Sequence, residues 1–439
     1  MKVLIVNTSE RTGGAAVAAN RLMMALNNNG VKAKMLVRDK EVLESRGQVL
    51  DPERNQATRP LDSLTVVGLP KSPLLRWHFL WERLVIFARL YFQRKHLFEL
   101  DIANAGTDIT RLREFREADI IHLHWINQGM LSLSDIRKIL HSGKPVIWTM
   151  HDIWPATAIC HLTLGCRNFT TQCRRCKYLP GGGSNHDLSA SIWKKKQQMV
   201  ADENIYYVAC SRWLESEAKA SALLRGQKIT SIPNPIDTHI YKKGDKQEAR
   251  KRLGLPLDKQ LILFASQRVT NRNKGMDYLI EACRKLHVKG VAPSVVILGG
   301  HAEEVVDQLP FESYPMGYIN DEQRIVDIYH AVDVFVLPSL SENLPNTIME
   351  AMACGVPCIG FKVGGIPEEI DHKKNGYVAE YRSAEDLAEG IRWILTEADY
   401  EELSRNAIQK VARNYSQQSV AMKYLDVYHQ AMAFKHYKL

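Results

Sequence analysis

The sequence has no unbroken apolar run of the roughly 20 residues that a membrane-spanning helix needs. The apolar start at residues 1–7 is also too short for the core of a secretory signal peptide. Internal repeats and low-complexity segments are absent as well. These absences argue against an integral membrane protein and a secreted one, and we expect a protein that remains on the cytoplasmic side.

A further absence concerns dinucleotide binding. Residues 3–6 are typical of a strand, residues 8–14 of a loop and residues 15–26 of a helix that begins at small residues. This Rossmann-like opening lacks the Gly-x-Gly-x-x-Gly pattern, so a nicotinamide dinucleotide site is disfavoured. Gly13 and Gly14 would let the backbone approach a phosphate closely, and the alternative is a tight turn that needs glycine for a positive φ.

What is present is an ordinary soluble composition. The chain has 439 residues, of which 45% are hydrophobic and 24% are charged. This length suggests two domains or three. Strand-like apolar runs alternate with helical segments through most of the sequence, as they do in βαβ units, so the predicted fold class is doubly wound α/β.

The most informative stretch is residues 337–357, which place two carboxylates around a strand-to-helix turn. Residues 332–337 are apolar and β-branched, as in a strand that is covered on both faces. Glu342 then falls in the loop at the carboxyl end of that strand, and Glu350 falls on the following helix. Ligands of open α/β sheets bind at this edge, where a helix amino terminus favours phosphate. The pattern therefore predicts a site for a sugar diphosphate.

The Glu-x7-Glu spacing, with Leu-Pro-Ser before it and Glu-Ala-Met-Ala-Cys-Gly-Val-Pro at its end, resembles the signature of family 4 of the retaining nucleotide-sugar glycosyltransferases. This resemblance implies the GT-B fold, in which two Rossmann-like domains face each other across a cleft. One departure is that Asn343, Leu344 and Pro345 replace the usual Gly-Phe-Gly, which removes one N–H from the phosphate cradle. The alternative interpretation makes Glu350 a solvated helix carboxylate and Glu342 a helix-capping acid.

The resemblance also implies roles for basic residues and imidazoles. Arg268 and Lys274 would clamp the donor diphosphate, and Arg272 could share this task because the loop is about one residue longer than usual. Such cations are needed because negative charge grows on the leaving diphosphate. His151, in Thr-Met-His-Asp, would contact the donor sugar, either as a neutral imidazole bonded to a hydroxyl or as a cation beside the leaving phosphate.

Four further positions complete the implied donor site. Glu350 would bind the ribose hydroxyls, Gly299 would lie beside the nucleotide, and Ile319 would meet the base through its backbone. Asn343 and Leu344 would line the same site. Two other imidazoles, His122 and His124, are weaker candidates, because strand alternation sends them to one face, where either could be a core histidine.

The resemblance divides the chain into three parts. Residues 1–235 would form an acceptor-binding domain, residues 236–415 a donor-binding domain, and residues 416–439 a helix that packs back on the first domain. The boundary is placed by Ile-Pro-Asn-Pro-Ile-Asp at residues 232–237, which is similar to the family's domain junction.

Four of the eight cysteines fall in one short segment at residues 160–176. Cys160, Cys166, Cys173 and Cys176 could bind a structural zinc ion, since the last two have the Cys-x2-Cys spacing of zinc knuckles. The wide spacing of the first pair and the missing second knuckle argue for free thiols instead. Disulfides are unusual in the cytosol.

Charge is distributed unevenly along the chain. Residues 1–240 contain 33 Lys and Arg against 22 Asp and Glu, and the remainder contains 25 against 27. The basic excess of the first half predicts an acidic partner, either anionic lipid or nucleic acid. Residues 71–95 mix aromatic side chains with cations, so they could lie in a membrane interface, and the alternative is that their aromatic face packs on its own domain.

The favoured function is therefore transfer of a sugar, with retained anomeric configuration, from a nucleoside diphosphate sugar to a glycan or polyprenyl-linked glycan. The expected setting is surface polysaccharide biosynthesis at the inner face of the cell membrane, with no catalytic cofactor or metal. One alternative is a nucleotide-sugar epimerase of the two-Rossmann type. Another is a basic zinc-bearing nucleic-acid-binding protein, although no known nucleic-acid module is present and no nucleic-acid partner is expected.

Overall fold

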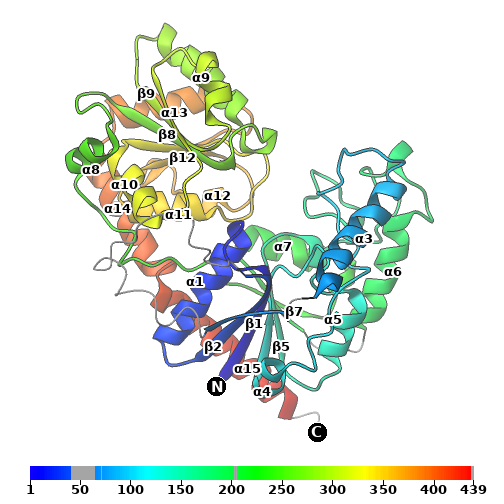
Figure 1. The fold of residues 1–439 in the computed structure, drawn as a ribbon. Coiled ribbons are helices and arrows are strands. Elements are labelled where there is room, and N and C mark those ends of the chain that lie inside the picture. The colour runs from blue at the N-terminus through cyan, green and yellow to red at the C-terminus, as the bar shows by residue number, and fades with distance from the viewer. Residues whose placement is uncertain (41–64, 71, 202, 204, 437–439) are drawn as a thin grey trace. The chain divides into compact units, whose positions relative to one another are not determined.

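The computed structural model describes residues 1–40, 65–70, 72–201, 203 and 205–436. These residues form two compact units: residues 1–232 together with 421–439, and residues 233–420. Lys71, the first residue of the basic aromatic stretch, lies outside the described residues, as do residues 437–439 at the end of the predicted last helix. Each unit is built around one parallel sheet (Figure 1).

The first unit contains a seven-stranded sheet with the order β3-β2-β1-β4-β5-β6-β7. Its strands are β1 (Lys2–Ser9), β2 (Lys32–Asp39), β3 (Val66–Gly68), β4 (Ile120–Leu123), β5 (Val146–Met150), β6 (Tyr206–Ala209) and β7 (Lys228–Ser231). Every neighbouring pair is parallel. All residues of β4 and β5 are buried, as their apolar sequences predict.

The helices of the first unit lie between these strands in the chain. They are α1 (Gly14–Asn28), α3 (Pro73–Arg89), α4 (Arg113–Glu117), α5 (Leu133–Leu140), α6 (Leu188–Val200) and α7 (Arg212–Ala220), with short 3₁₀ turns at η1 (Trp154–Ala156), η2 (Asn168–Thr170), η3 (Pro180–Gly182) and η4 (Ala222–Leu224). The last helix, α15 (Gln417–His436), contributes buried tyrosines to this unit. The Tyr428 hydroxyl lies 2.8 Å from Nδ1 of His122, and the Tyr424 hydroxyl lies 2.9 Å from Oγ1 of Thr149.

The second unit contains a six-stranded parallel sheet with the order β10-β9-β8-β11-β12-β13. Its strands are β8 (Leu261–Arg268), β9 (Ser294–Gly300), β10 (Ser313–Gly317), β11 (Val334–Leu337), β12 (Cys358–Phe361) and β13 (Gly376–Ala379). The helical elements are α8 (Lys246–Leu253), η5 (Arg272–Lys274), α9 (Met276–Val288), η6 (Ala302–Gln308), α10 (Glu322–Ala331), α11 (Asn346–Ala353), α12 (Ile366–Glu369), α13 (Ala384–Thr396) and α14 (Tyr400–Asn414).

Strand order places a switch point in each sheet. The chain winds outward from β1 to β3 and then restarts on the other side at β4, and it repeats this pattern from β8 to β10 and then at β11. In open α/β sheets, ligands bind at the carboxyl edge of the strands beside such a switch point. In the second unit the two strands are β8 and β11, which pair directly through Phe335 and Leu263.

Candidate functional site

The loops after β8 and β11 are tied together at the switch point of the second unit. The backbone N–H of Leu340 donates to the carbonyl of Asn273 at 2.8 Å, and the Asn273 side-chain amide donates to the carbonyl of Ser341 at 2.8 Å. Gly275 has φ of 76°, and a Cβ at this position would lie 1.9 Å from the Pro338 carbonyl oxygen. Glycine is therefore required at 275 both by its backbone conformation and by the close approach of the other loop.

This contact brings one predicted cation to one predicted carboxylate. The Lys274 ammonium lies 2.6 Å from Oε2 of Glu342, and both side chains are partly buried. Glu342 is not the cap of α11, since Pro345 occupies that position. The interpretation of Glu342 as a capping acid is therefore wrong. A lysine in this position can exchange a carboxylate for a phosphate oxygen, because its ammonium is a compact charge on a flexible stem.

A third loop closes around Glu342 from the side of β12. Gly364 has φ of 58°, and a Cβ there would lie 1.7 Å from the carbonyl oxygen of Glu342. The backbone N–H of Gly365 donates to the carbonyl of Asn343 at 2.7 Å. The glycine turn that follows β12 therefore fixes the backbone of Glu342 and Asn343, while Leu344 beside them is buried.

The second carboxylate of the Glu-x7-Glu pattern is buried on α11. Only 8% of Glu350 is exposed, and its Oε2 accepts a hydrogen bond of 2.9 Å from the Tyr329 hydroxyl. The interpretation of Glu350 as a solvated helix carboxylate is therefore wrong. A buried carboxylate with a fixed orientation can accept hydrogen bonds from vicinal hydroxyls, as the ribose of a nucleotide presents them.

The remaining predicted donor residues lie at the carboxyl ends of the neighbouring strands. Arg268 ends β8, is exposed, and donates from Nε to Oγ1 of Thr270 at 3.1 Å. Gly299 lies near the end of β9 with φ of 142°, where a Cβ would be 1.9 Å from the Ser266 carbonyl oxygen. Ile319 follows β10 and is half-buried. These residues share one sheet edge with Lys274 and Glu342, although no direct contact joins Arg268 or Ile319 to that pair among the described interactions.

Sequence reasoning missed Glu369, a carboxyl that lies near Glu342. Glu369 ends α12 and is fully buried, and neither of its carboxyl oxygens has a hydrogen-bond partner among the described residues. Burial first, and the charge of Glu342 second, raise the pKa of Glu369 well above its ordinary value. The sequence shows the pair Glu368-Glu369 after the glycine turn, but it carries no local signal that Glu369 is the buried member.

The parent protein should lose stability as pH rises, because Glu369 must then ionise while buried. We expect Glu369→Gln to remove this loss. The folded pKa of Glu369 is raised, so this group favours the folded state below its unfolded pKa and loses that contribution as pH rises towards the folded value. The variant should be more stable than the parent at pH 8, by about 1–3 kcal/mol, and similar at pH 4. Calorimetric midpoints at both pH values measure this, with the exposed Glu303→Gln as control. An unchanged pH profile would contradict the expectation.

In the first unit, His151 follows β5 and lies against a second imidazole. Its Nε2 is 2.9 Å from Nδ1 of His124, and its Nδ1 is 3.5 Å from the sulfur of Cys210. Burial lowers the pKa of His151 to about 4, although nearby Asp152 opposes this shift. At neutral pH His151 is therefore uncharged, which favours a hydrogen-bonding role over a cationic one.

The two other imidazoles differ in how their nitrogens are satisfied. His122 is fully buried and bonds Tyr428 through Nδ1 and Thr149 through Nε2, so it is a satisfied core histidine. His124 is also buried, but its Nε2 has no partner among the described residues. The rings of His122 and His124 lie 4.3 Å apart, as their alternation on one strand face predicts.

Sequence reasoning also missed a buried ionic network beside His151. His161 bonds Asp152 through Nδ1 at 2.7 Å and Asp101 through Nε2 at 2.6 Å. Burial opposes a charge on His161, but the two carboxylates outweigh it and raise the pKa of His161 to about 10. Asp152 also accepts a hydrogen bond of 3.0 Å from the indole of Trp125. This network anchors the loop that follows His151, and it joins segments too distant in sequence for a motif to reveal it.

The glycines of the first loop belong to this unit and not to the donor residues of the second. Gly13 precedes α1 with φ of 91°, and no atom lies within 4 Å of where a Cβ would be. Gly13 therefore has the positive φ that favours glycine, and Gly14 is the first residue of α1. A role for either residue in phosphate binding stays a prediction.

The cysteine segment gives the zinc prediction no support. Cys160, Cys166, Cys173 and Cys176 are free and half-buried. In the described ranges, no group of three or more His, Cys, Asp or Glu side chains is arranged so that it could hold a metal ion. Without a metal ion, burial raises the pKa of Cys160 and of Cys173 to about 12 each.

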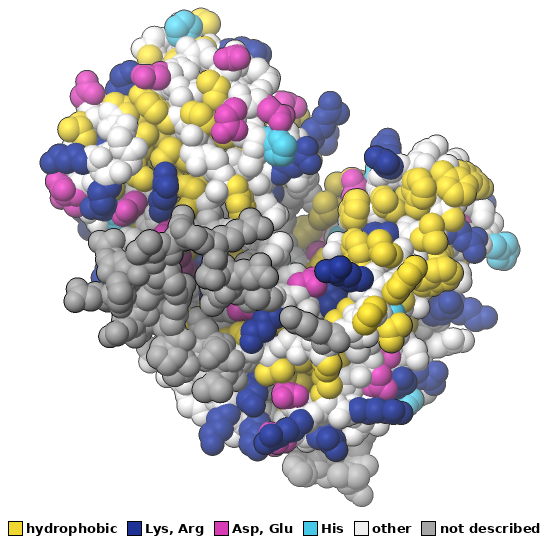
Figure 2. All heavy atoms as spheres, in the orientation of Figure 1, with side chains coloured by type: hydrophobic (Ala, Val, Ile, Leu, Met, Phe, Trp, Pro, Cys, Tyr) yellow, Lys and Arg dark blue, Asp and Glu magenta, His cyan; other side chains and the backbone are white. Residues whose placement is uncertain are grey.

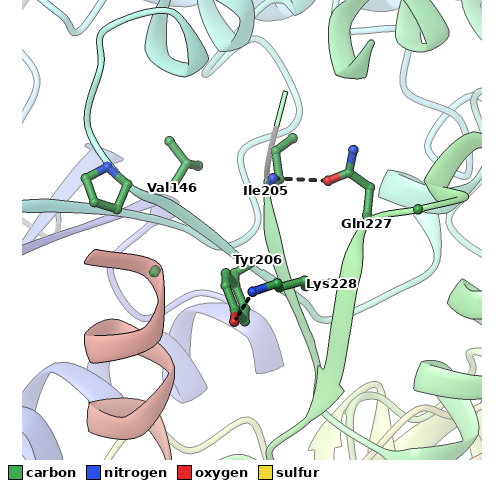
Figure 3. A pocket seen from close by; sticks show the side chains of 8 residues that line it. Val146, Ile205, Tyr206, Gln227 and Lys228 are labelled. Carbon is green, nitrogen blue, oxygen red and sulfur yellow. Dashed lines mark hydrogen bonds between the residues drawn. The ribbon is translucent and has the colours of Figure 1, made fainter. Parts of the chain in front are cut away.

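A small pocket lies at the opposite edge of the first sheet. Figure 3 shows it between the amino ends of β5, β6 and β7, where Lys228 donates to the Tyr206 hydroxyl at 3.0 Å and Ile205 donates to the Gln227 side chain at 3.0 Å. Its volume is about 100 Å³. This pocket is too small for a nucleotide, and it is on the wrong edge for a ligand of a doubly wound sheet.

The two parallel Rossmann-like sheets and the solved structures of similar fold confirm the GT-B fold that the sequence predicts. The chain belongs to glycosyltransferase family 4. The profile described as "Glycosyltransferase Family 4" matches residues 12–240, more than half of the chain, and the profile "Glycosyl transferases group 1" matches residues 245–414. The epimerase and nucleic-acid-binding alternatives are therefore not supported.

Curated relatives carry the same class of name. An uncharacterised glycosyltransferase of Methanocaldococcus jannaschii is 25% identical over 76% of this chain and 90% of its own length. A putative teichuronic acid biosynthesis glycosyltransferase of Bacillus subtilis is 34% identical over 46% of this chain. An N-acetyl-α-D-glucosaminyl L-malate synthase of Bacillus anthracis is 27% identical over 46% of this chain. The chain spans 50% and 54% of the length of the last two.

Solved structures agree on the fold. A sucrose-phosphate synthase from Thermosynechococcus elongatus superposes with a TM-score of 0.65 at 16% identity, covering 98% of this chain and 99% of that one. HepE from Anabaena, solved in complex with UDP-glucose, superposes with a TM-score of 0.63 at 16% identity, covering 98% of this chain and all of that one. At this identity the likeness concerns the fold alone.

Proposed function

We propose that the protein transfers a sugar from a nucleoside diphosphate sugar to a hydroxyl of a glycan or polyprenyl-linked glycan, with retention of the anomeric configuration. The observation that carries the proposal is the cluster at the switch point of the second unit, where Lys274 pairs with Glu342 and Glu350 is buried on the adjoining helix. A uridine diphosphate sugar is the first donor to test, because HepE is a structural neighbour that was solved with one.

In this proposal the diphosphate meets the cations and the ribose meets the carboxylate. Arg268 and Lys274 would neutralise the charge that grows on the leaving diphosphate, and no metal ion would be required. Glu350, held by Tyr329, would accept hydrogen bonds from the ribose hydroxyls. Glu342 would leave Lys274 for the donor sugar when phosphate replaces it.

The reaction would proceed on one face of the sugar. The bond between the anomeric carbon and the leaving phosphate oxygen breaks, the acceptor oxygen bonds to that carbon on the same face, and the acceptor proton passes to the departing phosphate oxygen. His151, uncharged at neutral pH, would contribute a hydrogen bond to a sugar hydroxyl. We place this activity in surface polysaccharide biosynthesis, in the cytoplasm at the inner face of the cell membrane.

A thermal-shift experiment tests the donor site. Purified protein is heated with uridine, guanosine, adenosine and thymidine diphosphates and their sugars. The site variants Glu350→Ala and Arg268→Ala are measured in the same way. The control is Arg284→Ala, which changes an exposed arginine of the same unit. A ligand that binds only the folded state must raise the midpoint. We expect a shift with one nucleotide that survives in the control and is lost in the two site variants. No shift with any nucleotide would contradict the proposal.

A further inference from the structure

Helix α3 presents its apolar face to solvent. Leu74, Trp77, Leu80, Trp81 and Leu84 are each between 52% and 63% exposed. Their spacing of three and four residues places them on one stripe of the helix. The interpretation in which this face packs on its own domain is therefore wrong.

The opposite face of the helix is charged and buried. Glu82 is fully buried and accepts backbone N–H groups of Ile102 at 2.9 Å and Ala103 at 2.6 Å. Arg83 is also buried and pairs with Asp101. Because these groups would lose their partners if the helix rotated, the Trp and Leu face cannot turn inward without leaving buried charges unpaired. Ile86 is fully buried on the same inward face, so α3 has apolar side chains on both faces and its orientation is fixed by the buried charged pair.

The apolar surface continues beyond the helix. Tyr91 is 72% exposed, Phe92 is 70% exposed and Phe98 is 63% exposed. Tyr91 and Phe92 have φ of 52° and 64°, a left-handed conformation that bulky residues rarely adopt. We call these three residues and the five of the helix stripe the aromatic patch. Figure 2 shows hydrophobic side chains gathered over the region where Figure 1 draws α3. A patch of this kind marks an interaction site.

Cations surround the aromatic patch. Arg76, Arg89, Arg94 and Lys95 are exposed, whereas Glu99 is the exposed acid among described residues 65–100. Glu99 is itself 2.7 Å from Nδ1 of His96. A twofold interface between copies of this chain would bring these like charges near one another, which disfavours a second copy as the occupant. Anionic lipid headgroups complement both the cations and the aromatic rings.

We propose that the aromatic patch inserts into the interface of an anionic bilayer and holds the first unit on the membrane. The attachment is peripheral in kind, since no helix in the described part of the chain is both long and apolar enough to cross a membrane. Trp77 and Trp81 enter the boundary between headgroups and acyl chains, and the surrounding cations contact lipid phosphates.

A groove beside the patch connects this surface to the sheet. It has a volume of about 1120 Å³ and is lined by Trp77 and Leu80 of α3 and by Arg38 and Asp39 at the carboxyl end of β2. A lipid-linked acceptor suits such a groove, because its chain stays in the bilayer while its charged and sugar parts reach the sheet edge. The choice of acceptor rests on the proposed function, whereas binding to the bilayer does not.

Vesicle flotation of the full chain tests the proposal. Vesicles of phosphatidylcholine are compared with vesicles that also contain phosphatidylglycerol, using the parent, Trp77→Ser/Trp81→Ser, and the control Leu257→Ser/Val288→Ser, which changes exposed apolar residues of the second unit. We expect the parent and control to float with anionic vesicles, and the tryptophan variant to lose about tenfold or more in partitioning. The Arg89→Gln/Arg94→Gln/Lys95→Gln variant should lose the preference for anionic lipid.

Either of two results would overturn the proposal. One is a parent protein that floats with neither vesicle, and the other is a tryptophan variant that floats as well as the parent. Sedimentation velocity without lipid identifies a second copy as the occupant if the parent is a dimer and the variant a monomer. The nucleotide-induced thermal shift is measured on the same variants, so loss of membrane binding is distinguished from failure of the donor site or of folding.

Discussion

Replacement of Lys274 by alanine is expected to lower kcat/KM by about 10²–10³-fold. Lys274 is placed by a loop that is bonded to the loop of Glu342, and its ammonium is 2.6 Å from that carboxylate. If it stabilises the charge of the leaving diphosphate, its removal affects the transition state more than donor binding. The loss should therefore fall mostly on kcat, measured with the donor that the thermal-shift experiment identifies.

The matched control is Lys251→Ala, which removes an exposed lysine from a pair of similar length, 2.8 Å, with Glu248. That variant should retain full activity. An unchanged kcat in Lys274→Ala would show that Lys274 does not act at the leaving group, and Arg272 on the same loop would then be the next residue to replace.

Replacement of His161 by alanine is expected to destabilise the first unit by about 3–5 kcal/mol at pH 7. His161 lies between Asp101 and Asp152 with 12% of its side chain exposed. The variant leaves these carboxylates without their shared cation. Seven of the eight tryptophans belong to the first unit, so denaturant unfolding followed by tryptophan fluorescence reports mainly on this unit.

The pH dependence of this effect has a definite sign. The pKa of His161 is raised from 6.5 to about 10 by folding, so its contribution is fully present below the unfolded pKa and is lost as pH rises through about 10. The difference between parent and variant should therefore shrink between pH 7 and pH 10. His141→Ala is the control, because His141 is an exposed histidine 3.0 Å from Glu203, and its removal should cost under about 1 kcal/mol. A difference that does not change with pH would contradict a charged His161.

Much of the fold could be predicted from the sequence because buried parallel strands are short apolar runs. The predicted strand at residues 3–6 lies within β1 at Lys2–Ser9, and the predicted strand at residues 332–337 is β11 at Val334–Leu337. The predicted doubly wound class and the GT-B fold are confirmed. Local patterns sufficed here, because a strand that is buried on both faces is a nearly continuous apolar run.

Helix α3 shows where local patterns fail. The sequence of α3 presents apolar and charged stripes, but which stripe turns inward depends on partners elsewhere in the chain. The backbone N–H groups of Ile102 and Ala103 donate hydrogen bonds to Glu82, which lies about 20 residues earlier in the chain. No periodicity within residues 73–89 encodes those donors. The charged network of His161 was missed for the same reason, because its two carboxylates come from separate segments.

The candidate site could be predicted as a set of residues but not as an arrangement. The Glu-x7-Glu pattern located Glu342 and Glu350, yet it did not reveal that the first would meet Lys274 and the second would be buried against Tyr329. Those contacts depend on the pairing of β8 with β11, which a single sequence does not specify. Glu369 was missed because its burial also arises from packing outside its own short helix.

The last helix has a consequence for how the protein is made. Tyr424 and Tyr428 of α15 are buried against Thr149 and His122, but residues 233–420 lie between them and the rest of the first unit. A ribosome that adds 5–20 residues per second needs roughly 10–40 s to translate that interval. During this time the amino-terminal unit has emerged without part of its core. Nascent chains halted before residue 424 should therefore expose His122 and engage chaperones that completed chains do not.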